Sequence, residues 1–228
     1  MSESHNRLSS DREVISELTT GRLSVYLRCL TYLESMGQKT ISSHDLAKRF
    51  HLNSAQIRKD LACFGEFGTR GVGYNVSQLK EHLIRELGID RTRNVIIVGA
   101  GNLGMALADY HGFNGNGFQV AALIDIDPNK VGRASRSGIP VLAYSEMRHV
   151  VRERQVEIAI IAVTADAAQD VYDSLAAAGV NAVLNFAPVQ LRLQSTVKLK
   201  SVDLRINLES LSFYLKNAED GVATPGDE

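Results

Sequence analysis

A stretch near the middle of the chain, residues 94–108, restricts the fold more than any other part of the sequence. Four β-branched residues, 95–98, lead into a glycine-rich turn, and a helix-forming run follows. Strand, tight turn and helix start therefore come in the order of a dinucleotide-binding fold. The three glycines of this turn would permit the turn itself, the approach of a pyrophosphate and close helix packing. The candidate cradle consists of Gly99, Ala100, Gly101, Asn102, Leu103 and Gly104.

An acidic residue stands at the distance that this fold requires. The apolar run 120–124 ends at Asp125, 21 residues after Gly104. An acid roughly 20 residues beyond the turn accepts hydrogen bonds from a ribose in such folds. Its charge would repel a 2′-phosphate, which favours NAD(H) over NADP(H), although the nearby Lys130 and Arg133 weaken that preference. A plain βαβ turn without a ligand is the alternative explanation of the pattern.

Strands and helices alternate through the rest of this half. Apolar runs at 139–142, 156–163 and 181–185 alternate with helical patterns near 145–153 and 166–178. This alternation predicts an α/β fold with a parallel sheet and helices on both faces. Ligands bind at the carboxyl ends of such strands. We therefore expect one crevice lined by Gly99, Asp125, Thr164 and Asn185, with Phe186 near the nicotinamide end.

The N-terminal third predicts a helix-turn-helix. Helical patterns cover 24–36, 41–50 and 53–64, and only about three residues separate the last two. With Ile57, Leu61 and Phe64 facing inward, four polar side chains near the start of the third helix project away from the core. Recognition helices use such side chains on bases and phosphates. The candidates are Ser54, Gln56, Arg58 and Lys59, with Arg58 suited to guanine, Gln56 to adenine and Lys59 to a phosphate. A solvated helix face is the alternative.

A glycine-rich tract directly after this helix favours DNA binding. Residues 64–76 contain four glycines in ten residues, alternating with larger side chains. The pattern predicts a β-hairpin with Thr69 and Arg70 at its tip, which is the wing of a winged helix. An enzyme's phosphate-binding loop is the alternative, but no Lys-Ser/Thr pair follows as in a P-loop.

Composition narrows the class of protein. The net charge of the 228 residues is −1, yet residues 20–85 carry ten Lys/Arg against five Asp/Glu. Cys29 and Cys63 lie in apolar patterns and indicate reduced thiols, with a redox disulfide as the alternative. We find no signal peptide, no apolar run that approaches 18 residues and no metal-ligand spacing, so we expect a cytoplasmic protein without a membrane partner.

The last helical pattern, 204–215, is apolar on more than one side and predicts burial against a second copy of the chain. A helix packed on its own domain is the alternative. The expected segments are a disordered arm 1–18, a winged-helix domain 19–88, a Rossmann domain 89–203, a C-terminal swapped helix 204–216 and a disordered tail 217–228.

Four motifs together resemble the Rex family of bacterial redox-sensing repressors. They are Ile57-Arg-Lys-Asp-Leu61, the tract 64–74, the turn 98–104 and Leu184-Asn-Phe-Ala-Pro188, within a similarity that covers roughly residues 20–216. The resemblance implies a homodimer that binds an inverted-repeat DNA operator with NAD⁺ or without nucleotide, and that NADH releases. It also implies control of respiratory and fermentative genes, and exchange of the C-terminal helix between subunits.

The resemblance also implies a switch network. Tyr110 corresponds to a tyrosine near the nicotinamide, which the family joins to an arginine of the first helix and an acid of the partner subunit. Here these correspond to Arg28 and Asp203. Thr164 stands where the family usually has proline, and His111 where asparagine is common, so contacts there can differ.

Two other functions remain as alternatives. An NAD-dependent oxidoreductase would need a proton donor beside the nicotinamide. Few candidates exist, because His111 follows the first helix of the Rossmann domain and no histidine follows His149. A CoA-binding module would share the Rossmann half but would not need a winged helix.

Overall fold

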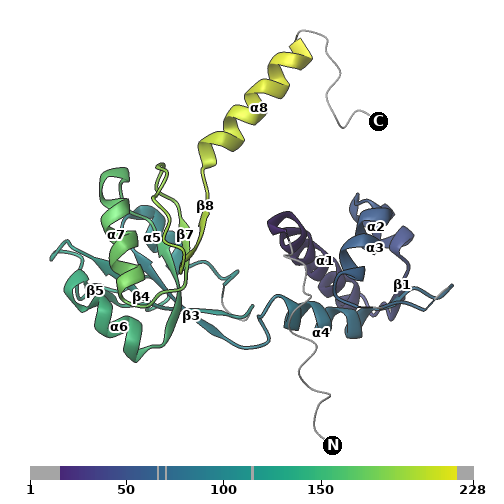
Figure 1. The fold of residues 1–228 in the computed structure, drawn as a ribbon, viewed down its shortest axis with the longest axis horizontal. Helices are drawn as coiled ribbons and strands as arrows, with labels where there is room; N and C mark the ends of the chain where they lie inside the picture. The colour runs from purple at the N-terminus through teal and green to yellow at the C-terminus, as the bar shows by residue number, and fades with distance from the viewer. Residues whose placement is uncertain (1–15, 66, 70, 114–115, 220–228) are drawn as a thin grey trace, which may run out of the picture. The chain divides into compact units, whose positions relative to one another are not determined.

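The structure is a computed structural model, and it describes residues 16–65, 67–69, 71–113 and 116–219. The chain divides into two compact units, Met1–Arg91 and Thr92–Glu228. The division falls three residues after the boundary expected between residues 88 and 89. Figure 1 shows the helices and strands of each unit.

Four helices and a small strand pair make up the described part of the first unit. Ser16 caps α1 by accepting a hydrogen bond from the N–H of Thr19, so this helix begins two residues before the expected domain start. The hydrophobic core of the unit joins α1, α2, α3 and α4 through Leu30, Leu46, Ile57 and Leu83. The elements are α1 (Glu17–Ser35), β1 (Thr40–Ile41), α2 (Ser43–Phe50), α3 (Ser54–Ala62), β2 (Tyr74–Asn75) and α4 (Val76–Glu86).

The connection between α2 and α3 has the expected length. His51 ends α2 in the left-handed conformation with φ 53°, and the Asn53 carboxamide oxygen caps α3 by accepting from the N–H groups of Ala55 and Gln56. These two signals stop one helix and start the next within three residues, as a helix-turn-helix requires.

The predicted wing differs from the structure along most of its length. Thr69 and Gly73 form a tight turn closed by two backbone hydrogen bonds, each of 3.0 Å. The returning segment, β2, pairs with β1 and not with the described residues 64, 65, 67 and 68. A glycine is required at the crossing, because a Cβ on Gly73 would lie 2.4 Å from the Ile41 carbonyl oxygen. The expected tip residue Arg70 lies outside the described residues.

The second unit is a six-stranded parallel sheet with the order β5-β4-β3-β6-β7-β8. Counted within this unit, the order is 3-2-1-4-5-6, which is that of the dinucleotide-binding fold. The direction of the order reverses between β3 and β6. The elements are β3 (Arg93–Val98), α5 (Asn102–Ala108), β4 (Phe118–Asp125), β5 (Val141–Ala143), α6 (Met147–Glu153), β6 (Val156–Ile161), α7 (Ala165–Ala177), β7 (Ala182–Asn185), β8 (Lys198–Ser201) and α8 (Leu204–Glu219).

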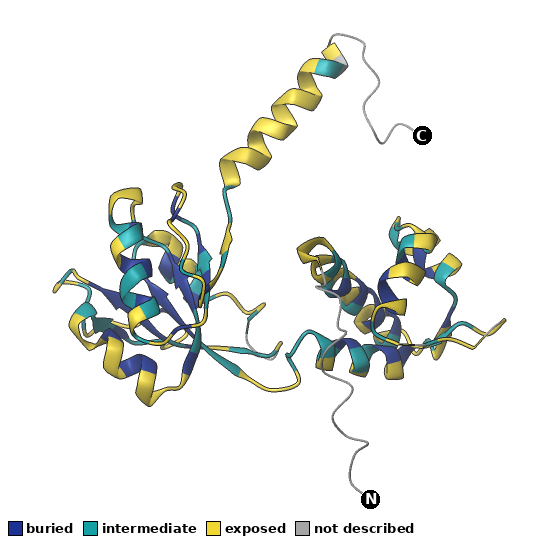
Figure 2. Ribbon diagram, in the orientation of Figure 1, coloured by how far each residue is buried: buried dark blue, intermediate teal, exposed yellow. Residues whose placement is uncertain are grey.

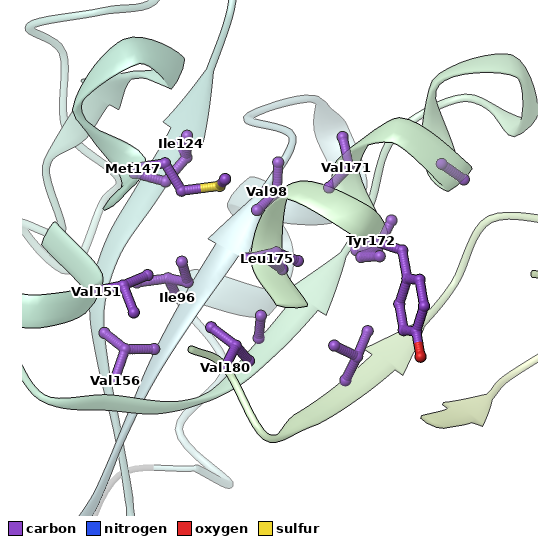
Figure 3. Packing of buried hydrophobic residues seen from close by; sticks show 14 of the residues in the cluster. Ile96, Val98, Ile124, Met147, Val151, Val156, Val171, Tyr172, Leu175 and Val180 are labelled. Atoms are coloured by element: carbon purple, nitrogen blue, oxygen red, sulfur yellow. The ribbon is translucent and has the colours of Figure 1, made fainter. Parts of the chain in front are cut away.

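Alternate residues of β3 bury opposite faces of the sheet. Ile96 and Val98 pack against α6 and α7, as Figure 3 shows around Leu175 and Tyr172. Val95 and Ile97 belong to the cluster that includes α5. Helices therefore cover both faces, which confirms the predicted fold class. Strand β8 was not predicted, because two lysines interrupt its short apolar pattern.

The last helix, α8, is exposed from Leu204 to Lys216 (Figure 2). It continues to Glu219, three residues into the expected tail. Among the described residues, no helix is long and apolar enough to cross a membrane. Both cysteines are free, with Cys29 buried and Cys63 exposed, so the structure contains no bond between them.

Candidate functional site

The glycine turn after β3 leaves one open side. The backbone of Gly99 has φ +104°, and a Cβ there would lie 2.3 Å from the Ala162 carbonyl oxygen. A Cβ on Gly104 would lie 1.8 Å from the Gly99 oxygen, so helix and strand are in close contact. A Cβ on Gly101 would meet nothing within 4 Å. The first and third glycines are therefore required by the fold, whereas the space at Gly101 is available to a ligand.

Asp125 joins this turn to the end of β4. Its carboxylate accepts from the N–H groups of Ala100 at 2.7 Å and Asp127 at 2.8 Å, and from Lys130 Nζ at 3.1 Å. Burial alone would raise the pKa of Asp125, but these hydrogen bonds hold the pKa below its ordinary value. The carboxylate is therefore charged at neutral pH and fixed beside the turn.

A cavity of about 650 Å³ lies against both features. This volume is within the range of cofactor sites, roughly 300–1,000 Å³. The structure brings seven of the predicted ligand residues to it: Gly99, Gly101, Asn102, Leu103, Asp125, Thr164 and Phe186. Ala100 and Gly104 form the turn behind it. These features fit a dinucleotide. The backbone N–H groups of the turn and the open space at Gly101 suit a pyrophosphate, and the anchored carboxylate of Asp125 suits a ribose.

Ile126 and Tyr144 are among the cavity residues that were not predicted from the sequence. Ile126 is 80% exposed directly after the acid, and Tyr144 follows β5. An apolar side chain directly after the acid can pack against a ring of the ligand. In a single sequence, however, Ile126 cannot be distinguished from the buried apolar residues 120–124 that precede the acid. Tyr144 follows a strand of three residues, which is too short for its end to be located reliably.

Asn185 differs from the expectation. The residue is fully buried, and its carboxamide accepts from the N–H of Ala187 and donates to the carbonyl groups of Ala187 and Val189. Both ends of the amide are therefore used inside the protein. Asn185 shapes the loop that carries Phe186 and does not face the cavity, because its hydrogen bonds turn the chain after β7.

The three switch candidates are distributed over both units of the chain, with Arg28 in the first and Tyr110 and Asp203 in the second. Tyr110 is 56% exposed, and its ring contacts that of Phe113 with centroids 5.1 Å apart. Asp203 accepts from the N–H of Arg205 at the start of α8, and no hydrogen bond joins it to Tyr110 in the described part of the chain. Arg28 is exposed on α1 in the other unit. The network therefore remains a proposal.

The turn before Tyr110 is firmly anchored. Asp109 accepts from the backbone N–H groups of Ser137 at 2.7 Å and Arg136 at 3.2 Å. Hydrogen bonds from the Ser135 side chain and these N–H groups lower the pKa of Asp109 to about 2.

On the first unit, α3 presents two exposed cations. Arg58 Nη1 donates to the Ser43 hydroxyl at 3.0 Å, and Lys59 is exposed beside it. Arg58 and Thr69 both line a hollow of about 550 Å³. Ser54, at the start of the helix, is partly exposed. Gln56 differs from the expectation: it is half-buried, and its amide donates to Asp60 at 2.7 Å instead of projecting outward.

The two units match two different families. "Putative DNA-binding protein N-terminus" matches residues 14–62, and "CoA binding domain" matches residues 90–189. Together with the helix-turn-helix and the cavity beside the glycine turn, these matches define a DNA-binding regulator that carries a nucleotide domain.

Full-length relatives identify the family. The chain is 50% identical over 202 residues to the redox-sensing transcriptional repressor Rex of Carboxydothermus hydrogenoformans, covering 89% of this chain and 97% of that protein. It is 46% identical to Rex of Streptomyces coelicolor, covering 92% and 84%. The chain belongs to the Rex family of redox-sensing transcriptional repressors.

Solved structures agree. A crystal structure of RSP in complex with β-NAD⁺ and operator DNA has a TM-score of 0.86 and 36% identity, covering 91% of this chain and 95% of that one. RSP in complex with β-NADH has a TM-score of 0.81 and 35% identity, covering 91% and 97%. The protein is therefore a transcriptional regulator and not an enzyme. The relatives that cover most of the chain are repressors and not oxidoreductases, and the match to "CoA binding domain" is confined to the second unit.

Proposed function

We propose that this chain represses transcription as a homodimer that binds an inverted-repeat operator and leaves it when NADH rises. The observation that carries the proposal is the presence, in one chain, of exposed Arg58 and Lys59 on a recognition helix and of a cavity at a dinucleotide turn. Relatives and solved structures of the same family, with NAD⁺, NADH and operator DNA, support both halves.

The nucleotide would lie across the second unit. The open side of Gly101 would receive the pyrophosphate, and Asp125 would accept from the adenosine ribose. A 2′-phosphate would meet the negative charge of Asp125, so we propose NAD(H) and not NADP(H). When bound, the nicotinamide supplies the redox signal, because its two states differ by one hydride and one positive charge. Thr164 and Phe186 lie where the ring end would be received.

The DNA would meet α3 and the turn after it. Arg58 has the fork geometry that pairs with guanine, and Lys59 suits a phosphate. Ser54 and Thr69 would contact the DNA backbone on either side, and the neighbouring Arg70, which lies outside the described residues, would add a third contact. An inverted repeat follows from the symmetry of a dimer.

Dimerisation would use α8. Seven large apolar side chains on this helix are 42–67% exposed, a patch that soluble proteins cover with a partner. The seven are Leu204, Ile206, Leu208, Leu211, Phe213, Tyr214 and Leu215. We propose that α8 is exchanged between the two subunits.

The switch would be Arg28, Tyr110 and Asp203 of the partner subunit. Such a network exists in only one dimer shape, so a ligand that disturbs Tyr110 shifts the balance between shapes. The nucleotide can shift that balance only by the difference between its affinities for the two shapes.

The test is a DNA-binding titration. The protein first selects a duplex from a random-sequence pool, and binding to that duplex is then followed with added NAD⁺ or NADH. We expect NADH alone to release the duplex. Asp203→Ala should bind NADH normally but no longer respond to it. Release by NAD⁺, or an unchanged response in the variant, would contradict the switch.

A further inference from the structure

A buried carboxylate on the recognition helix is the centre of a four-residue network. Asp60 is 2% exposed. One carboxylate oxygen accepts from Arg22 Nη2 at 2.7 Å and from Gln56 Nε2 at 2.7 Å. The other accepts from Arg22 Nε at 2.6 Å and from the Tyr26 hydroxyl at 2.8 Å. A carboxylate has about four acceptor positions, so this one is saturated.

We propose that Asp60 is a positioning residue for DNA reading, which fixes the rotation of α3 about its own axis through Arg22 and Tyr26 of α1. The inference rests on the proposed function, because it assumes that α3 reads DNA. Asp60 would touch no nucleotide itself, since it is buried under the face that carries Arg58 and Lys59.

Directional contacts are needed to fix the rotation of α3 about its axis. Only Ile57 and Leu61 of this helix are buried apolar anchors, and apolar contacts have no direction. With a helix radius of about 5–6 Å including side chains, a roll of about 20° moves a side-chain end by about 2 Å. That shift would break the paired hydrogen bonds of Arg58 with a base. Two parallel bonds from the Arg22 fork resist the roll because they fix both distance and plane.

Stability alone does not account for the network. A buried ion pair loses most of its gain to desolvation, and apolar residues of similar volume often stabilise as well. Burial would raise the pKa of Asp60, yet the hydrogen bonds from Arg22, Gln56 and Tyr26 hold it below its ordinary value. The partners are therefore matched to a charged carboxylate. Apolar residues in their place could be as stable, but they would lack the directional hydrogen bonds that fix the orientation of α3.

The network also reassigns Gln56. It precedes Asp60 by one helical turn, on the same face, and donates to the same carboxylate. Gln56 therefore supports the acid and does not read adenine.

The experiment compares the selected duplex with a scrambled duplex of the same composition. Asp60→Asn keeps the shape but loses the charge, and we expect at least about tenfold weaker binding to the selected duplex. Binding to scrambled DNA, and the dependence of binding on salt, should change little because the phosphate contacts remain. Tyr26→Phe removes one hydrogen bond and should lower the preference about threefold.

Glu34→Gln is the matched control. Glu34 ties α1 to α4 through Lys80 at 2.5 Å and Ser77 at 2.9 Å, and it does not touch α3. This variant should keep the preference for the selected duplex. Re-selection with Gln56→Met should return the same sequence with a weaker preference throughout, whereas a change at one base pair would make Gln56 a reader.

The outcomes separate the two proposals. If the parent protein selects no sequence, the proposed function fails. If the parent selects one, and folded Asp60→Asn and Tyr26→Phe keep the full preference, the positioning role is overturned. Should Asp60→Asn not fold, Tyr26→Phe and Arg22→Lys decide, since Lys keeps the charge without the fork.

Discussion

Each unit of this protein has a buried carboxylate beside its functional segment, but the two are bound differently. Asp60 is 2% exposed and receives four hydrogen bonds from the side chains of Arg22, Tyr26 and Gln56. Asp125 is 8% exposed and receives two backbone N–H bonds and one from Lys130. Asp125 also borders a cavity, whereas Asp60 borders none of those described.

The difference distinguishes positioning from binding. A saturated carboxylate has no acceptor position left for a ligand, so Asp60 can act only on the elements that hold it. Asp125 is held by the backbone around it and still has acceptor capacity toward the cavity. Burial and a lowered pKa are common to both residues, so neither property alone identifies a ligand site.

The largest expected effect is on stability in the first unit. Asp60→Ala leaves Arg22, Tyr26 and Gln56 without their acceptor. Removal of one partner of a buried pair costs about 3–5 kcal/mol, and because the Arg22 side chain is 35% exposed we expect a loss of about 3 kcal/mol. The free energy of unfolding, measured by urea titration with circular dichroism, should fall by that amount. A loss below about 1 kcal/mol would show that the network is loosely held and would remove the contrast with Asp125.

Gly104→Ala tests the fold-determining side of the glycine turn. The new Cβ would lie 1.8 Å from the Gly99 carbonyl oxygen, a backbone atom that cannot rotate away. We expect a loss of about 3 kcal/mol in the second unit. Gly104→Ser should behave alike, and a stable Gly104→Ala protein would show that α5 can move away from β3.

Asp125→Asn should mainly affect nucleotide binding. The amide keeps the size but loses the charge that accepts from the ribose, so NADH should bind about 10- to 100-fold more weakly. Quenching of NADH fluorescence measures this. DNA binding without nucleotide should persist, because the first unit is unchanged. Undiminished NADH affinity would move the ribose away from Asp125.

Gly101→Ala sharpens the contrast within the turn. No atom lies within 4 Å of the new Cβ, and φ is −82°, so the unfolding free energy should change by no more than about 1 kcal/mol. NADH affinity should nevertheless fall about tenfold if the pyrophosphate occupies this space. Equal losses in Gly101→Ala and Gly104→Ala would contradict the assigned division of roles.

The smallest effect is a pH dependence. The folded pKa of Asp60 is lowered, so its stabilisation is complete above the unfolded value of about 3.9 and is lost as pH falls through the folded pKa. The unfolding free energy of the parent should therefore fall below about pH 4. In Asp60→Asn that part of the slope should be missing, and an identical slope would assign the titration to another group.

The sequence predicted the glycine turn, the acid and the helix-turn-helix because each depends on local spacing. It did not predict the role of Asp60, which resembles part of an exposed Arg-Lys-Asp cluster. A signal was present: Asp60 follows Ile57 by three residues and precedes Leu61, so it shares their inward face. Its partners on α1 are 34 and 38 residues away, and no local pattern connects them.

Other differences have similar causes. Asn185 was expected at the cavity because it ends a strand, but its carboxamide forms hydrogen bonds with the backbone of the turn after β7. The expected hairpin does not form a continuous pair of strands, because β2 pairs with β1, which lies more than 30 residues earlier in the chain. Tertiary contacts decide such long-range pairing, and the alternation of glycines and larger side chains within one segment does not predict it.

The exposed apolar face of α8 has a consequence for measurements on this protein. If that face is covered only by a second chain, the melting temperature depends on protein concentration and rises as the concentration increases. Comparisons among variants then hold only at matched amounts. The cellular abundance of the repressor would likewise set what fraction of it is assembled to occupy a two-part operator.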